Sequence, residues 1–197
     1  ILGVGLWAGG ATAEDARLTP LRTADESRGY EAVGRIDLGP NSFCTGTLIA
    51  PDLVLTAAHC MYDSRTRAPR SVDGIEFRAG WRDGRALAYR GIRRAILHPE
   101  YALGGSEGRS VRVANDLALL ELDRPIRTHG VEPFRTAPTP RKGEEVGVIS
   151  YAIHREERPS LERMCDVLAR PSQMLVISCT VDFGASGAPI LSFTDGE

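Results

Sequence analysis

The sequence predicts an all-β fold in two lobes, and three observations lead to this prediction. Its apolar runs are short, and Gly, Pro, Asn and Asp residues separate them, as expected for strands joined by turns. No long helical periodicity occurs along the chain. A proline-rich stretch at residues 125–143 divides the runs into an earlier group of six and a later group of four.

The six earlier runs predict one closed antiparallel barrel, because six strands suffice to close such a sheet on itself. We assign this barrel to residues 29–124. The connectors Gly39-Pro40-Asn41 and Pro51-Asp52 have turn chemistry, and the segment after the third run has room for one helical turn. The expected strands are residues 30–38, 42–50, 53–59, 74–81, 86–97 and 117–122.

The later runs predict a second lobe at residues 144–197, reached through the linker 125–143. They number only four, so we expect an incomplete second barrel in a chain cut at both ends. The expected strands are residues 145–153, 163–169, 174–180 and 188–193.

The first residues are apolar up to Gly10 and continue into Ala11-Thr12-Ala13, a small-x-small pattern typical of signal cleavage. We interpret residues 1–13 as the remnant of a signal peptide and residues 14–28 as an N-terminal extension; the alternative is a disordered apolar end. No segment is long enough for a transmembrane helix, which argues against stable membrane insertion.

Composition excludes several classes of function. The 197 residues carry 24 basic and 26 acidic side chains, a net charge of -2, and no basic stripe, so nucleic acid is not an expected partner. Four cysteines fit an exported protein, secreted or periplasmic. They allow three disulfide pairings, and their spacing does not resemble a zinc site, so we expect no metal.

Three short motifs carry candidate chemistry. They are "LTAAHC" with His59, "NDLALLEL" with Asp116, and "GASGAP" with Ser186. A serine hydroxyl needs a base to become a nucleophile, histidine suits that exchange near neutral pH, and a carboxylate fixes the histidine tautomer. Together these residues predict a catalytic triad for acyl transfer.

Each residue alone has an ordinary interpretation, since a histidine after a strand is usually half-buried and an aspartate before one is usually a turn residue. The chain order His, Asp, Ser differs from the order of α/β-hydrolases and of subtilisins. The segment around Ser186 also lacks the G-x-S-x-G elbow.

The stretch "CTGTLIAPDLVLTAAHC", together with "ILHPEY", "NDLALLEL" and "GASGAP", resembles the chymotrypsin-like (trypsin-like) serine proteases from about Gly29 onward. The resemblance implies two perpendicular six-stranded barrels with the active site between them. It also implies an oxyanion hole formed by the N–H groups of Gly184 and Ser186. A disulfide between Cys44 and Cys60 is implied as well.

One departure from animal trypsins and one further resemblance point to a particular branch of this family. Ala185 stands where those enzymes carry an aspartate that receives a freed N-terminus, so that activation switch is absent. The pattern "MCDVL…ISCTVDFGASGAP" instead resembles the bacterial glutamyl-endopeptidase-like branch, which implies a pairing of Cys165 with Cys179. Thr180 lies where trypsin relatives hold the specificity residue, and the bacterial branch makes that correspondence unreliable. His98, His129 and His154 are interpreted as structural or surface residues.

The predicted function is that of a secreted serine endopeptidase, a monomer that acts on proteins or peptides through an acyl-enzyme without a cofactor. Three alternatives stay open. The first is a catalytically weak or inactive relative that binds proteins, the second is an esterase-type acyl hydrolase, and the third is a cysteine-stapled adhesion module.

Overall fold

The computed structural model describes residues 18–101, 113–171 and 174–193, and its strands all pair antiparallel. It confirms the all-β class, with helix confined to short turns such as the 3₁₀ turn η1 (Ala58–Met61). The predicted signal remnant and its cleavage pattern lie outside the described residues. No helix in the described part of the chain combines the length and the apolar character needed to cross a membrane.

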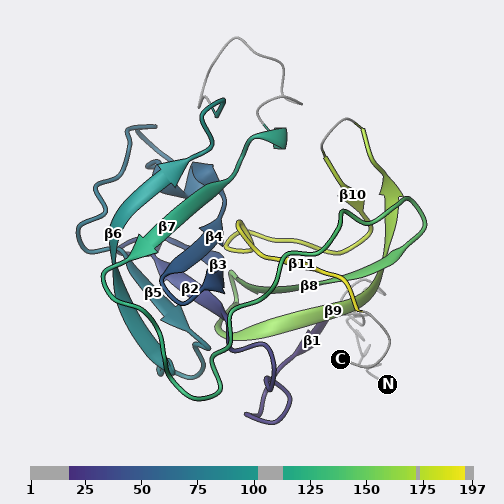
Figure 1. Ribbon diagram of the computed structural model, residues 1–197, viewed down its shortest axis with the longest axis horizontal. Helices are drawn as coiled ribbons and strands as arrows, with labels where there is room; N and C mark the ends of the chain where they lie inside the picture. The colour runs from purple at the N-terminus through teal and green to yellow at the C-terminus, as the bar shows by residue number, and fades with distance from the viewer. Residues whose placement is uncertain (1–17, 102–112, 172–173, 194–197) are drawn as a thin grey trace, which may run out of the picture.

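The first half of the chain forms the predicted closed barrel, with strand order β2-β3-β4-β7-β6-β5 (Figure 1). Each of the six expected runs contains a strand, and each strand is shorter than the run that predicted it. The strands are β2 (Val33–Asp37), β3 (Phe43–Ala50), β4 (Leu53–Thr56), β5 (Glu76–Ala79), β6 (Ala88–Leu97) and β7 (Ala118–Leu122).

The barrel interior is filled by large apolar side chains from its strands. Ile36, Leu48, Val54, Phe77 and Leu120 are completely buried, and they belong to one continuous cluster. Burial of each such side chain contributes about 1.5–3 kcal/mol relative to exposure. This closed, filled barrel is a rigid support for the residues at the ends of its strands.

The second half of the chain, together with a short strand from before the barrel, forms an open sheet of five strands (Figure 1). Its main path is β1-β9-β8-β11, and β10 pairs with β9 beside that path. The strands are β1 (Leu18–Pro20), β8 (Glu145–Ala152), β9 (Arg155–Ala169), β10 (Val176–Ile177) and β11 (Ile190–Leu191). The expectation of an incomplete second barrel agrees with this arrangement, since the sheet does not close on itself in the described residues.

Two elements of this sheet differ from the prediction. β1 lies in the segment that we expected to be an extension. The sequence did not predict it because three residues are too few to show a strand periodicity, and the strand forms by pairing with β9. β9 begins eight residues earlier than expected, in charged sequence that contains Pro159. Pro159 falls between the register points Ser150–Ser160 and Ala152–Arg155, where the register to β8 shifts, so its missing N–H interrupts no regular pairing.

The barrel and the sheet share a second apolar cluster. Val33 and Trp81 of the barrel half pack there with Ile149 and Tyr151 of β8. The buried Tyr151 hydroxyl donates to the Trp81 carbonyl oxygen at 2.8 Å, and burial raises the pKa of this phenol. The two units are therefore joined by both apolar packing and buried hydrogen bonds.

Candidate active site

His59 lies in η1, immediately after β4. The turn is anchored by a disulfide from Cys60 to Cys44 on β3, with Cα atoms 6.4 Å apart, and by the buried Ala57 and Ala58. The pairing implied by the resemblance is therefore present in the structure. The His59 side chain remains 42% exposed, so its ring can be reached by a bound molecule.

Asp116 stands two residues before β7, the barrel neighbour of β4. The register pairs Thr56 with Ala118, so the end of β4 and the start of the antiparallel β7 meet at the same edge of the barrel. The Asp116 carboxylate binds His59 twice: Oδ1 accepts from the His59 backbone N–H at 2.8 Å, and Oδ2 lies 2.6 Å from Nδ1. This double contact fixes the orientation of the ring.

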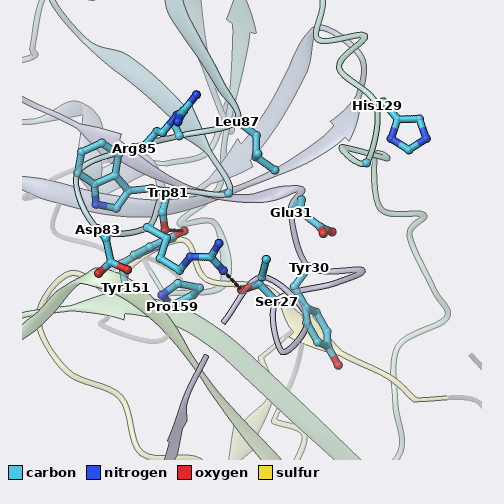
Figure 2. Close-up of a pocket in the computed structure, with 15 residues that line it drawn as sticks. Ser27, Tyr30, Glu31, Trp81, Asp83, Arg85, Leu87, His129, Tyr151 and Pro159 are labelled. Carbon is cyan, nitrogen blue, oxygen red and sulfur yellow. Dashed lines mark hydrogen bonds between the residues drawn. The ribbon is translucent and has the colours of Figure 1, made fainter. Parts of the chain in front are cut away.

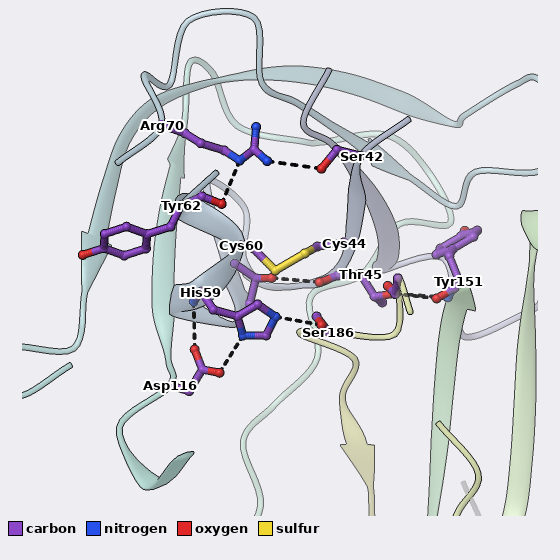
Figure 3. Close-up of a disulfide and its surroundings, with 12 residues drawn as sticks. Ser42, Cys44, Thr45, His59, Cys60, Tyr62, Arg70, Asp116, Tyr151 and Ser186 are labelled. Carbon is purple, nitrogen blue, oxygen red and sulfur yellow. Dashed lines mark hydrogen bonds and ion pairs between the residues drawn. A yellow bond between two sulfur atoms is a disulfide. The ribbon is translucent and has the colours of Figure 1, made fainter. Parts of the chain in front are cut away.

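Ser186 belongs to the loop between β10 and β11 in the second sheet. Its Oγ lies 2.8 Å from His59 Nε2, on the opposite side of the ring from Asp116 (Figure 3). The structure thus brings His59, Asp116 and Ser186 into one hydrogen-bonded chain across the junction of the two units.

The glycines around Ser186 have specific structural reasons. Gly184 (φ 96°) and Gly187 (φ 82°) both adopt the left-handed region that side chains disfavour. A Cβ at Gly184 would overlap the ring of Phe43, and a Cβ at Gly187 would overlap the Thr45 carbonyl oxygen and the Thr56 hydroxyl. Glycine is therefore required on each side of the serine for close contact between loop and barrel.

The N–H groups expected to form an oxyanion hole have no acceptor among the described residues. Neighbouring groups of the same loop are bonded: Ala185 N–H donates to the Asp182 carbonyl at 3.0 Å, and the Ser186 carbonyl accepts from Thr45 N–H at 2.9 Å. The N–H groups of Gly184 and Ser186 thus keep their capacity to donate to a bound oxygen. Their role as an oxyanion hole stays a prediction.

A second disulfide and a buried glutamate side chain contact the loop before Ser186. Cys165 on β9 pairs with Cys179, as the branch resemblance implies. The Glu162 carboxylate is buried beside this disulfide and accepts from the Thr180 N–H at 2.7 Å. Burial lowers the pKa of the nearby Arg155 guanidinium, while the carboxylates of Asp182 and Glu162 act in the opposite direction. The Thr180 backbone is therefore held in place, and nothing further is assigned to its side chain.

The remaining predicted residues lie apart from these contacts. The ring of His98 accepts the Glu100 N–H at 3.3 Å, and His154 sits at a turn with positive φ. His129 lines a pocket between the turn at residues 24–31 and the β5–β6 connection, shown in Figure 2, and none of His59, Asp116 and Ser186 lines this pocket. The candidate metal-binding clusters among the described residues each contain two disulfide cysteines, whose sulfurs are not free thiolates.

One contact residue was missed by sequence reasoning. Thr45 on β3 is completely buried and hydrogen-bonds to the loop of Ser186 from the barrel side. Threonine is a common residue in β-strands, so the residue type alone did not indicate a contact with the Ser186 loop. Its place directly after Cys44 in "CTGT" was the available hint, since Cys44 tethers the turn that carries His59.

Comparison with known proteins adds a family model and several relatives. Residues 44–197 match the model described as a trypsin-like peptidase domain. A 94-residue segment is 41% identical to a modular serine protease of Drosophila melanogaster, covering 46% of this chain and 15% of that protein. Another relative is serine protease 23 of Bos taurus, 28% identical over 166 residues that cover 75% of this chain and 43% of that protein. The chain spans less than half the length of these curated relatives.

Solved structures resemble the fold of the chain. A Glu endopeptidase in complex with MPD superposes with a TM-score of 0.71 at 21% identity, covering 88% of this chain and 79% of that one. A kallikrein-related peptidase 10 complex with Zn²⁺ superposes with a TM-score of 0.60 at 20% identity, covering 83% and 78%. The barrel and the sheet beside it therefore have the chymotrypsin-like arrangement.

Proposed function

Because this chain belongs to the trypsin-like peptidase domain family, we propose that it carries the catalytic centre of a serine endopeptidase. The observation that supports the proposal most directly is the chain of hydrogen bonds from Asp116 through His59 to Ser186, with distances of 2.6 and 2.8 Å. Nucleophile, base and orienting carboxylate stand in the geometry that acyl transfer requires.

In the proposed reaction, Ser186 Oγ attacks the carbonyl carbon of a peptide bond while His59 Nε2 takes the hydroxyl proton. Asp116 holds the proton on Nδ1 and stabilises the imidazolium. The developing oxyanion accepts hydrogen bonds from Gly184 and Ser186 N–H, and a lost donor of this kind typically costs about 10²–10³ in kcat.

The imidazolium then gives its proton to the leaving amine, and the C–N bond breaks to leave an acyl-enzyme on Ser186. A water molecule attacks this ester, again with His59 as base, and proton return to Ser186 Oγ releases the carboxylic acid product. Every group that these steps use belongs to the chain, the substrate or water.

The two disulfides support an extracellular or periplasmic location, because oxidised cysteines persist in such compartments. We infer that the substrates are proteins or peptides. The assignment to the glutamyl-endopeptidase-like branch stays a prediction that rests on Ala185 and the Cys165–Cys179 bridge. The monomeric state is also a prediction.

A fluorophosphonate probe tests the proposal, since it phosphonylates only an activated serine. We expect stoichiometric labelling of the wild-type chain and none of Ser186→Ala, with casein hydrolysis lowered by about 10⁶-fold. Ser42→Ala is the matched control, because the Ser42 hydroxyl accepts one long hydrogen bond, from Arg70 at 3.3 Å, and this variant should label like wild type. A folded wild-type chain that takes no label would overturn the proposal.

A further inference from the structure

Thr45 is a residue of the barrel whose polar atoms mostly bind the other unit. It lies on β3 and has no exposed surface. Its N–H donates to the Ser186 carbonyl at 2.9 Å, and its hydroxyl donates to the Gly184 carbonyl at 2.9 Å. The same hydroxyl accepts from the Tyr151 N–H of β8 at 3.1 Å (Figure 3). The donor and acceptor capacities of this hydroxyl are thus both used on the second sheet and its loop.

These bonds fix the peptide groups next to the nucleophile. The Gly184–Ala185 peptide is held at both ends, by Thr45 at its carbonyl and by the Asp182 carbonyl at its N–H. The Ser186 carbonyl is held by the Thr45 N–H. Rotation of either peptide would break buried hydrogen bonds. The Ser186 N–H belongs to the Ala185–Ser186 peptide between these two, and the Gly184 N–H belongs to the peptide just before them. The Thr45 bonds therefore restrain the backbone next to both donors.

The loop has no polar side chain of its own at position 185 to set this orientation. Ala185 is buried and carries only a methyl group. The barrel therefore supplies the contact, and Thr56 in turn supports Thr45, since its hydroxyl donates to the Thr45 carbonyl at 2.8 Å.

We propose that Thr45 of the first barrel is a positioning residue, whose hydroxyl orients the oxyanion-binding N–H groups of Gly184 and Ser186. The inference rests on the proposed endopeptidase function and adds the means by which one unit sets the geometry of a loop in the other. Thr45 acts through the loop and does not itself touch the substrate.

The chain offers a matched control on the same strand. Thr47 lies two residues further along β3, so its side chain is on the same side of the strand, and it is also buried at 3% exposure. Its hydroxyl has no hydrogen-bond partner among the described residues. Thr45→Val and Thr47→Val therefore remove the same atom from the same strand, and only the first removes contacts to the Ser186 loop.

The experiment compares these variants in kcat, KM and affinity for a peptide boronate, whose tetrahedral adduct mimics the transition state; the substrate is a peptide chosen from wild-type casein cleavage. Thr45→Val should lower kcat and boronate affinity together by about 10–100-fold, and KM should change less than about threefold, because the lost geometry matters only when the oxyanion forms. Thr47→Val should match wild type, and Thr45→Ser should restore activity to within about threefold.

One further measurement separates positioning from general damage, and a second pair of variants covers the case in which Thr45→Val does not fold. The low-field proton resonance of His59 Nδ1 should persist in Thr45→Val, since neither His59 nor Asp116 shares a hydrogen bond with Thr45 in the described part of the chain. Its loss together with kcat would overturn the inference in favour of a global defect. If Thr45→Val does not fold, Thr45→Ala and Thr45→Ser provide the same comparison, because they differ by one oxygen.

The failure of this inference differs from that of the proposed function. A wild-type chain without fluorophosphonate labelling contradicts the endopeptidase itself. A labelled wild type with Thr45→Val equal to it in kcat and boronate affinity contradicts only the role of Thr45.

Discussion

The closed barrel and the open sheet hold their parts of the site by different means. In the barrel, neighbouring strands β4 and β7 bring His59 and Asp116 to one edge, and a disulfide anchors the turn. In the sheet, Ser186 sits on a loop that ends in the two-residue strand β11. This loop takes its position from Thr45 and Thr56 of the barrel as well as from its own sheet. The closed barrel thus contributes hydrogen bonds to the Ser186 loop of the neighbouring sheet, whereas His59 and Asp116 lie on the barrel itself.

The largest effect is expected where the loop meets the barrel, at Gly187. A methyl group there would overlap the Thr45 carbonyl oxygen and the Thr56 hydroxyl, and the positive φ adds strain. Gly187→Ala should lower the rate of fluorophosphonate labelling by at least about 100-fold, because a displacement of about 1 Å is enough for such a loss.

Gly143→Ala serves as its control, since Gly143 has a similar φ of 86° and open space around its Cβ position. This variant should lose about 1 kcal/mol of stability and label at the wild-type rate. Equal labelling of Gly187→Ala and Gly143→Ala would contradict the idea that the barrel positions the loop.

A second prediction compares the same truncation in the two units. Leu120 on β7 is completely buried inside the barrel, whereas Leu168 on β9 is 48% exposed on the sheet. Leu120→Ala should lower the free energy of unfolding by about 3–5 kcal/mol through lost burial and a cavity, and Leu168→Ala by less than about 1 kcal/mol. Urea unfolding of both variants measures the difference, and similar losses would contradict the burial of Leu120 and the exposure of Leu168 on which this prediction rests.

A smaller loss of stability than that of Leu120→Ala is expected from removal of the disulfide in the open sheet. Replacing Cys165 and Cys179 together by alanine should cost about 2–3 kcal/mol, given their separation of 14 residues. The rate of amide hydrogen exchange should rise in β9 and β10, because the disulfide restrains local opening there. It should stay unchanged in the barrel strands β2 to β7. Exchange that rises equally in the barrel would show that the two units unfold as one.

The pattern of short apolar runs and turn residues was sufficient to predict all six barrel strands, because each run has strand length, apolar character and a turn on both sides. It was insufficient for β1 and for the first half of β9. Those strands are polar or very short, and they exist because an adjacent strand supplies their hydrogen bonds. Local pattern does not record such pairing partners.

The three motifs around His59, Asp116 and Ser186 were likewise visible in the sequence, because acyl transfer restricts the residue types and glycine marks the tight turn. The tertiary structure decided how those residues meet and what holds them. Thr45 looks like any strand threonine until β3, β8 and the Ser186 loop converge on its hydroxyl. A sequence determines which chemical groups are available, and only the packing of one unit against the other decides which of them share a hydrogen bond.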